Sequence, residues 1–139
     1  VDIVKLLLFS RTISENDIVV KNISLHTSVP EIDKIASSLF SDESIEKDNQ
    51  TIEIINGAEV AGLGNWLSRL LANMGVSVVL VSTSSVPEET SNIYYSGKKT
   101  YTIERIGKIL GYNIVKRNEQ AIADIVISIG KDSIFRLGF

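Results

Sequence analysis

Apolar residues recur along the chain in two patterns, short continuous runs and a spacing of three to four residues. Together these patterns predict a domain of strands and helices. From residue 51 onward, short apolar runs bounded by turn residues predict strands at 51–55, 76–81, 92–95, 112–115 and 123–129. Between them, apolar residues three and four positions apart predict helices over about 60–74 and 99–110. This order, β-α-β-β-α-β-β from residue 51, predicts an α/β fold with helices packed on a mixed β-sheet. The run at 76–81 is nearly continuous valine and leucine, which is typical of a strand covered on both faces.

Glycines mark the turns and the helix ends of this pattern. Asn56-Gly57 is a strong turn dipeptide after the first strand, and Gly75 stands where a glycine commonly ends a helix. A glycine inside a helix costs about 0.5–1 kcal/mol relative to alanine, so we expect Gly62 and Gly64 to be compensated by close packing of the helix on the sheet. The turn and packing motif comprises Asn56, Gly57, Gly62, Leu63, Gly64 and Gly75.

The first forty residues form a smaller unit. It contains a dense apolar run at 3–9, a predicted strand at 18–25, and a predicted helix that begins with the capping box Ser28 and Glu31. Ile32, Ile35 and Leu39 lie on one stripe of that helix. Residues 41–50, SDESIEKDNQ, are polar and predict a linker. We therefore predict a partial unit at 1–47 and a domain at 48–139.

Composition excludes several kinds of chemistry. The chain has no cysteine, which excludes thiolate catalysis, disulfides and cysteine-ligated metals, and it has a single histidine, His26. Residues 1–90 carry 6 basic and 13 acidic side chains, whereas residues 91–139 carry 8 basic and 4 acidic ones. The basic half suggests either ordinary solvated faces or a surface for an anionic partner. The acidic balance of the whole chain and its few aromatic residues do not suggest nucleic-acid binding.

Two catalytic interpretations find weak support. Gly57, Gly62 and Gly64 around a helix start suggest a phosphate loop, but the spacing matches neither the G-x-x-x-x-G-K-[ST] nor the G-x-G-x-x-G pattern. Glu59 at the helix start would repel a phosphate. The carboxylate pairs all lie in polar segments, and we expect them to be solvated; they are Asp42/Glu43, Glu46/Asp48 and Glu88/Glu89.

Tyrosines and basic residues gather in the second half of the chain. Tyr94, Tyr95, Tyr101 and Tyr112 surround the predicted strand at 92–95 and the helix after it, near Lys98 and several further cations. Tyrosines beside cations can bind sugars or anionic polymers by stacking and hydrogen bonding. The alternative is a half-buried strand with one solvated ring. The candidate ligand surface comprises Tyr94, Tyr95, Lys98 and Lys99.

The segment from 51 to 132 resembles the C-terminal domain of LytR-CpsA-Psr cell-envelope proteins. The matching text is IEIINGAEVAGLGNWLSRLLANMGVSVVLV, NIYYSGKKTYTIERIGKILG and ADIVISIGKD, which follow one another in the order of the family pattern. Three positions depart from that pattern: Ala58 replaces the common Thr or Ser, Gly64 the usual Ala, and Val76 the usual aromatic residue. The resemblance implies that residues 1–47 are the tail of an upstream LytR-CpsA-Psr catalytic domain, which transfers lipid-linked glycopolymers onto peptidoglycan.

From this resemblance we expect a non-catalytic binding module of an extracytoplasmic envelope protein, without cofactor or metal. Its partner would be a cell-wall polymer or an envelope protein. The chain begins with Val1, and we expect a membrane anchor in a segment outside it. Two alternatives stay open: a structural domain that dimerises or orients the catalytic domain, and a small nucleotide-dependent enzyme domain.

Overall fold

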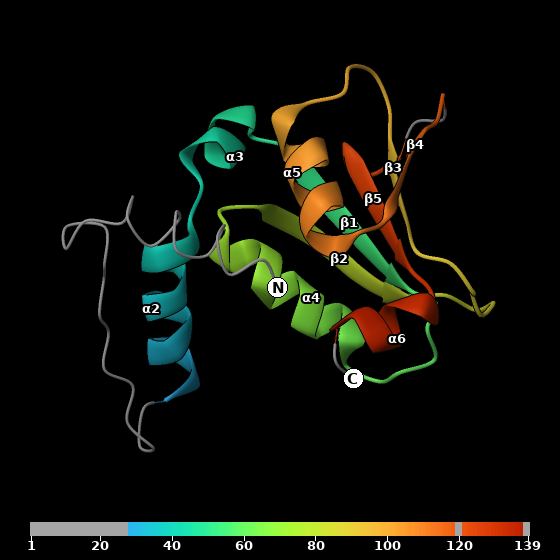
Figure 1. Cartoon of the computed structure of the whole chain (residues 1–139), viewed down its shortest axis with the longest axis horizontal. Coiled ribbons are helices and arrows are strands. Elements are labelled where there is room, and N and C mark those ends of the chain that lie inside the picture. Colours follow the sequence, from blue (N-terminus) through green and yellow to red (C-terminus); the bar gives the residue numbers. More distant parts are fainter. Residues whose placement is uncertain (1–27, 119–120, 138–139) are drawn as a thin grey trace, which may run out of the picture.

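A five-stranded mixed sheet in the order β2-β1-β5-β3-β4 is the framework of the domain. The computed structural model describes residues 28–118 and 121–137, so the predictions at 3–9 and 18–25 and the residue His26 lie outside the described part of the chain (Figure 1). The strands are β1 (Thr51–Asn56), β2 (Ser77–Thr83), β3 (Asn92–Tyr95), β4 (Asn113–Lys116) and β5 (Ile125–Ile129). β2, β1 and β5 are parallel, whereas β3 and β4 run parallel to each other and antiparallel to β5.

Two helices cover the same face of this sheet. α4 (Leu63–Asn73) packs on β1 and β2, and α5 (Tyr101–Leu110) packs on β3 and β4 (Figure 1). Alternate residues of β1 are buried under them, and Glu53 and Ile55 on the opposite face stay half-exposed. Because no described helix lies on that opposite face, we call it the open face. The β-α-β-β-α-β-β order and the α/β fold with a mixed sheet are confirmed.

The position of β2 differs from the prediction. β2 is an edge strand, and Val79 in its middle is 50% exposed, so the expectation of a strand covered on both faces was wrong. The register between β1 and β2 shifts at Ile52/Glu53, which is a bulge-like irregularity in the pairing. Bulges are common on edge strands because they hinder pairing with another chain. An apolar run is therefore compatible with an edge position when one of its faces packs on a helix.

The glycines of the turn motif serve three different purposes. Gly64 lies so close to β2 that an added Cβ would be 3.0 Å from Val81 Cγ1, which agrees with close packing. Gly62 has open space around it instead; it precedes α4 with a φ of +82°, a conformation that glycine adopts without strain. The helix accordingly begins at Leu63, which is fully buried, and not near residue 60. Gly75 follows the helix with a φ of +92°.

The polar segment expected to be a linker contains a helix, α3 (Glu43–Asp48). Its Ile45 is 2% exposed and belongs to the hydrophobic core. α3 packs on α5, and the Asp42 amide donates to the Met74 carbonyl (3.1 Å). A single apolar residue among nine polar ones thus packs the segment into the domain core.

Two further helices complete the described structure. α2 (Val29–Phe40) begins at the predicted capping box, where the Ser28 amide donates to the Glu31 carboxylate (2.9 Å). α2 rests on α4, supported by an ion pair between Asp33 and Arg69 (2.8 Å), but none of its side chains is fully buried. α6 (Asp132–Leu137) follows β5 and was not predicted. Within residues 28–118 and 121–137, no helix is both long enough and apolar enough to span a membrane.

Candidate ligand surface

Tyr94 and Arg117 form a stacked pair at the ends of β3 and β4. The guanidinium carbon of Arg117 lies 3.2 Å from the centre of the Tyr94 ring, which is a cation–π contact. The parallel pairing of β3 with β4 brings the two residues together, and the Arg117 amide donates to the Tyr95 carbonyl (2.8 Å). The ring holds the guanidinium in place, and a guanidinium carries five N–H donors in a fixed planar arrangement.

A small pocket lies beside this pair on the open face. Its volume is about 70 Å³, well below the roughly 300–1,000 Å³ of an enclosed small-molecule site. A ligand here would be held at the surface, with one group inserted. The lining residues are Tyr94, Tyr95, Ser96, Arg117, Ala121, Ala123, Asp124 and Val126.

Asp124 contributes a carboxylate to the same pocket lining as Arg117. The Thr51 amide (2.9 Å) and hydroxyl (2.8 Å) both donate to Asp124 Oδ2, and the Asp124 amide donates to Thr51 Oγ1 (3.2 Å). These hydrogen bonds from Thr51 lower the pKa of Asp124 below its usual value. The pocket therefore offers fixed donors and a charged acceptor, which is a combination suited to hydroxyl-rich ligands.

The four residues of the predicted ligand surface lie on two sides of the sheet. Tyr94 faces the open side, whereas Tyr95 packs against the hydrophobic core, because consecutive residues of a strand point to opposite faces. Lys98 and Lys99 are exposed in the loop between β3 and α5, and Lys99 pairs with Glu104 (3.4 Å). The structure thus joins Tyr94 to Arg117, and places Lys99 next to α5.

The other two tyrosines have separate environments. The Tyr101 hydroxyl donates to Asp42 (2.9 Å), which connects α5 to the start of α3. This hydrogen bond lowers the pKa of Asp42 and raises the pKa of Tyr101. Tyr112 is buried and hydrogen-bonded to Ser133 (2.6 Å). Neither ring is part of the Tyr94 surface.

Several carboxylates that we expected to be solvated hold the fold together instead. Asp48 accepts hydrogen bonds from the amide and the hydroxyl of Thr102, both at 2.8 Å, in the first turn of α5. Glu88 accepts a hydrogen bond from the Ser128 hydroxyl. Glu43 agrees with the expectation and only pairs with Lys47 (3.4 Å) at the surface. These contacts are structural.

The turn after β1 is closed by its own residues. Gly57 donates its N–H to the Ile129 carbonyl (2.9 Å), and the Asn56 side chain donates to the Val60 carbonyl (2.8 Å) and accepts from the Ala58 amide (3.2 Å). A phosphate loop needs free backbone N–H groups to surround the anion. Here the Gly57 and Ala58 amides already have partners.

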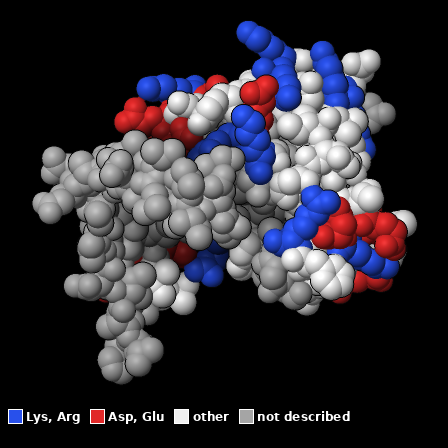
Figure 2. All heavy atoms as spheres, viewed as in Figure 1, with Lys and Arg blue, Asp and Glu red and all other residues white. Residues whose placement is uncertain are grey.

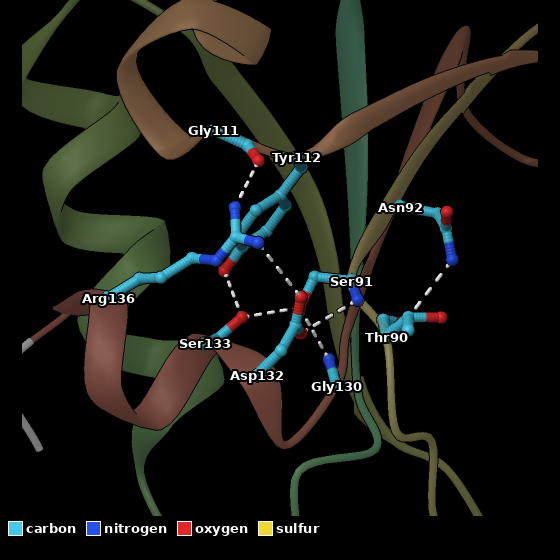
Figure 3. A network of polar contacts seen from close by, with 9 residues as sticks. All are labelled: Thr90, Ser91, Asn92, Gly111, Tyr112, Gly130, Asp132, Ser133 and Arg136. Carbon is cyan, nitrogen blue, oxygen red and sulfur yellow. Dashed lines mark hydrogen bonds and ion pairs between the residues drawn. The ribbon is translucent and has the colours of Figure 1, made fainter.

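A buried polar network lies just before the start of β3 (Figure 3), whereas Tyr94 lies near the end of that strand. Ser91 Oγ lies 2.5 Å from Asp132 Oδ1 and 2.5 Å from Ser133 Oγ, and it accepts a hydrogen bond from the Gly130 amide (2.9 Å). Ser133 continues the network to Tyr112, and burial raises the pKa of that tyrosine. A hydroxyl beside a carboxylate could suggest a nucleophile, but Ser91 and Ser133 are closed off from solvent. The network joins the start of β3, the end of β5 and α6.

Positive charge collects around α5 and the β3–α5 loop. In Figure 2 the upper right part of the view carries mostly Lys and Arg, whereas the lower right part mixes both signs. Among the described residues where both signs meet, Lys131 pairs with Glu89 (2.9 Å) and Glu59 (3.3 Å). Within the described ranges, no three His, Asp or Glu side chains are grouped so that they could hold a metal ion.

Arg117 is the residue that sequence reasoning missed. It follows a short strand and lies 23 positions after Tyr94, so no local pattern connects them. A signal did exist: Arg117 directly follows Lys116, the last residue of the strand that the topology places next to the tyrosine strand. The contact between Arg117 and Tyr94 follows only from the pairing of β4 with β3, which the sequence alone does not give.

Comparison with known proteins gives one match. The family model LytR_C, described as LytR cell envelope-related transcriptional attenuator, matches residues 49–132. No match was found among curated proteins or among solved structures. The matched segment runs from the end of α3 through β5 and includes the whole sheet, the stacked Tyr94–Arg117 pair and most of the buried network. Since this segment is more than half of the chain and agrees with the resemblance drawn from its residues, the chain belongs to the LytR_C family of cell-envelope proteins.

Proposed function

We propose that this domain is a non-catalytic module of an extracytoplasmic cell-envelope protein and that it binds a cell-wall polymer through the open face of its sheet. The observation that carries the proposal is the Tyr94–Arg117 pair, with the guanidinium held 3.2 Å above the ring centre beside the Asp124 carboxylate. Sugars present hydroxyl groups that both donate and accept, so a fixed guanidinium and a nearby carboxylate suit them.

The form of the pocket supports a polymer over a free small molecule. A volume of about 70 Å³ accommodates a side group but not a whole ligand. A polymer gains affinity from several shallow contacts at once, because each further contact becomes intramolecular after the first. The open face beside the pocket supplies further area, with Val126 and Ile55 half-exposed on neighbouring strands.

A catalytic role finds less support among the described residues. The buried Ser91–Asp132 network is closed to a substrate, and the turn after β1 uses its own amides. We therefore expect no phosphotransferase or pyrophosphatase activity from the purified chain. Any such activity that copurifies with the chain through successive columns would contradict this part of the proposal.

Co-sedimentation of the whole chain with purified, insoluble peptidoglycan tests the binding role. We expect the chain to pellet with the polymer, and Arg117→Gln to weaken binding about tenfold or more, since a hydrogen bond to a charged group contributes roughly 1.5–3 kcal/mol. Arg69→Gln is the matched control, because Arg69 is an exposed arginine on α4, away from the open face. If the chain stays in the supernatant, or if both variants bind like the wild type, the proposal fails.

A further inference from the structure

A groove runs between α5 and the edge strand β4, on the helix-covered side of the sheet and separate from the Tyr94 pocket. With a volume of about 440 Å³, it is much larger than that pocket. Gly107 and Ile114 form an apolar floor: an added Cβ at Gly107 would lie 2.5 Å from Ile114 Cδ1, so the helix and the strand are in close contact there. The lining residues are Lys99, Glu104, Gly107, Lys108, Tyr112 and Ile114.

Two lysines lie in the lining of this groove, and a third lies beside it on β4. Lys99 and Lys108 line it directly, and Lys116 lies two positions after Ile114, which places it on the same side of β4. The single carboxylate of the lining, Glu104, already pairs with Lys99 (3.4 Å). Lys108 and Lys116 have no ion pair within the described part of the chain, and neither does Lys98 in the adjoining loop.

This lack of partners distinguishes the groove from most of the described surface. Most cations elsewhere face a carboxylate: Arg69 pairs with Asp33, Arg105 with Asp42, Lys131 with Glu59 and Glu89, and Arg136 with Asp132. Lys34 on α2 is the exception among the described lysines away from this edge. Uncompensated positive charge is therefore concentrated along one edge of the sheet, and on the open side of the same edge Arg117 continues it.

We propose that the groove between α5 and β4 binds the anionic backbone of a linear polymer. The inference rests on the proposed function and specifies the class of polymer, a chain with regularly spaced phosphate or similar anionic groups. Lysines suit such a ligand because an ammonium attracts an oxyanion without demanding a fixed planar geometry.

The energetics favour a polymer over a single anion. One exposed ion pair contributes only about 0.2–1 kcal/mol, so a free phosphate at this rim binds weakly. A linear polyanion contacts several of these lysines at once, and the contacts add up within one chain. The apolar floor of the groove, at Ile114 and Gly107, accommodates the uncharged part of the repeating unit.

Titration of the whole chain with long-chain inorganic polyphosphate tests the inference, with orthophosphate and neutral dextran as comparison ligands. We expect polyphosphate to bind, orthophosphate to bind at least a hundredfold more weakly, and dextran not to compete. The double variant Lys108→Gln/Lys116→Gln should lower polyphosphate affinity about tenfold or more. It should also reduce the slope of log affinity against log salt by roughly two, one per cation removed.

The matched control is Lys34→Gln/Lys47→Gln, which removes the same charge from α2 and α3. We expect it to bind polyphosphate within about twofold of the wild type. Equal losses in the two double variants would mean that net charge alone attracts the polymer, and would overturn the inference. Absence of polyphosphate binding at 50 mM salt would overturn it as well.

The same variants separate this inference from the proposed function. If Lys108→Gln/Lys116→Gln loses polyphosphate but still pellets with peptidoglycan, both proposals stand and use different surfaces. If peptidoglycan binds without any response to the groove variant and polyphosphate does not bind at all, the proposed function survives and the groove inference is refuted. If polyphosphate binds as expected and peptidoglycan does not, the Tyr94–Arg117 proposal is the one that fails.

Discussion

Replacing Ile45 by alanine should destabilise the whole domain, although Ile45 lies in a segment that is otherwise polar. Its side chain is 2% exposed and it is the only buried residue of α3. Truncating a buried isoleucine to alanine costs about 2–5 kcal/mol, which includes the lost transfer free energy and the cavity left behind. We expect about 2–4 kcal/mol, because a six-residue helix can partly collapse into the space. For a domain of this size, that loss corresponds to a decrease in Tm of roughly 10–20 °C.

Urea denaturation measures this loss, followed by far-ultraviolet circular dichroism and by the fluorescence of Trp66, which lies on α4 away from α3. Leu39→Ala is the control, since Leu39 is 38% exposed on α2 and its truncation should cost less than about 1 kcal/mol. If Ile45→Ala costs no more than Leu39→Ala, α3 contributes nothing to the core, and residues 41–50 behave as the linker that their polarity suggests. A decrease in the slope m without a change in the midpoint would also count against the argument, because cavity formation changes stability and not the exposed area.

Three further predictions concern the fold. A chain of residues 49–139 should unfold cooperatively but at lower urea concentration than residues 41–139, because it lacks both the Ile45 side chain and the Asp48 carboxylate that Thr102 bonds; identical midpoints would contradict the role assigned to α3. Gly130→Ala should cost about 2–3 kcal/mol or more in urea unfolding, since its Cβ would lie 2.6 Å from the Thr90 backbone, whereas Gly62→Ala has open space and should cost about 1–2 kcal/mol for its positive φ; the reverse order would refute this. Burial raises the pKa of Tyr112, so its contribution to stability is present below the pKa of the unfolded chain, near 10, and is lost as the pH rises through the higher folded value. Tyr112→Phe should therefore flatten the alkaline decrease of the unfolding free energy above about pH 9, and an unchanged alkaline profile would show that this residue does not cause it.

Local patterns in the sequence were sufficient for the order of the elements. The helical spacing of Leu63, Leu67 and Leu71 and the apolar run of β5 depend on residues within one or two turns of each other, so each predicts its element without knowledge of the rest. The capping box at Ser28 and the glycine after α4 are equally local. The same segments of the sequence also show the resemblance to the LytR C-terminal domain.

These local patterns did not predict the order of the strands in the sheet. The apolar run of β2 reads like a central strand, yet β5, the last strand in the chain, lies between β1 and β3 and leaves β2 at the edge. An apolar run indicates that both faces of a strand are apolar, but it does not indicate which strands or helices lie next to that strand. In α3, likewise, Ile45 is one apolar residue among polar ones, and only its burial in the core and the contact of α3 with α5 connect the segment to the domain.

The candidate site shows the same division. The sequence identified Tyr94 and the lysines after it as candidates, because an aromatic strand beside cations is visible in a short stretch of text. Tertiary structure decided that Tyr94 and Tyr95 face opposite sides, that Arg117 covers Tyr94, and that Lys99 and Lys108 line one groove. The physical reason is that helix and strand periodicity follow from interactions between near neighbours in the chain. Contacts across the sheet depend instead on strand pairings between residues far apart in the sequence, and a single sequence does not record those pairings.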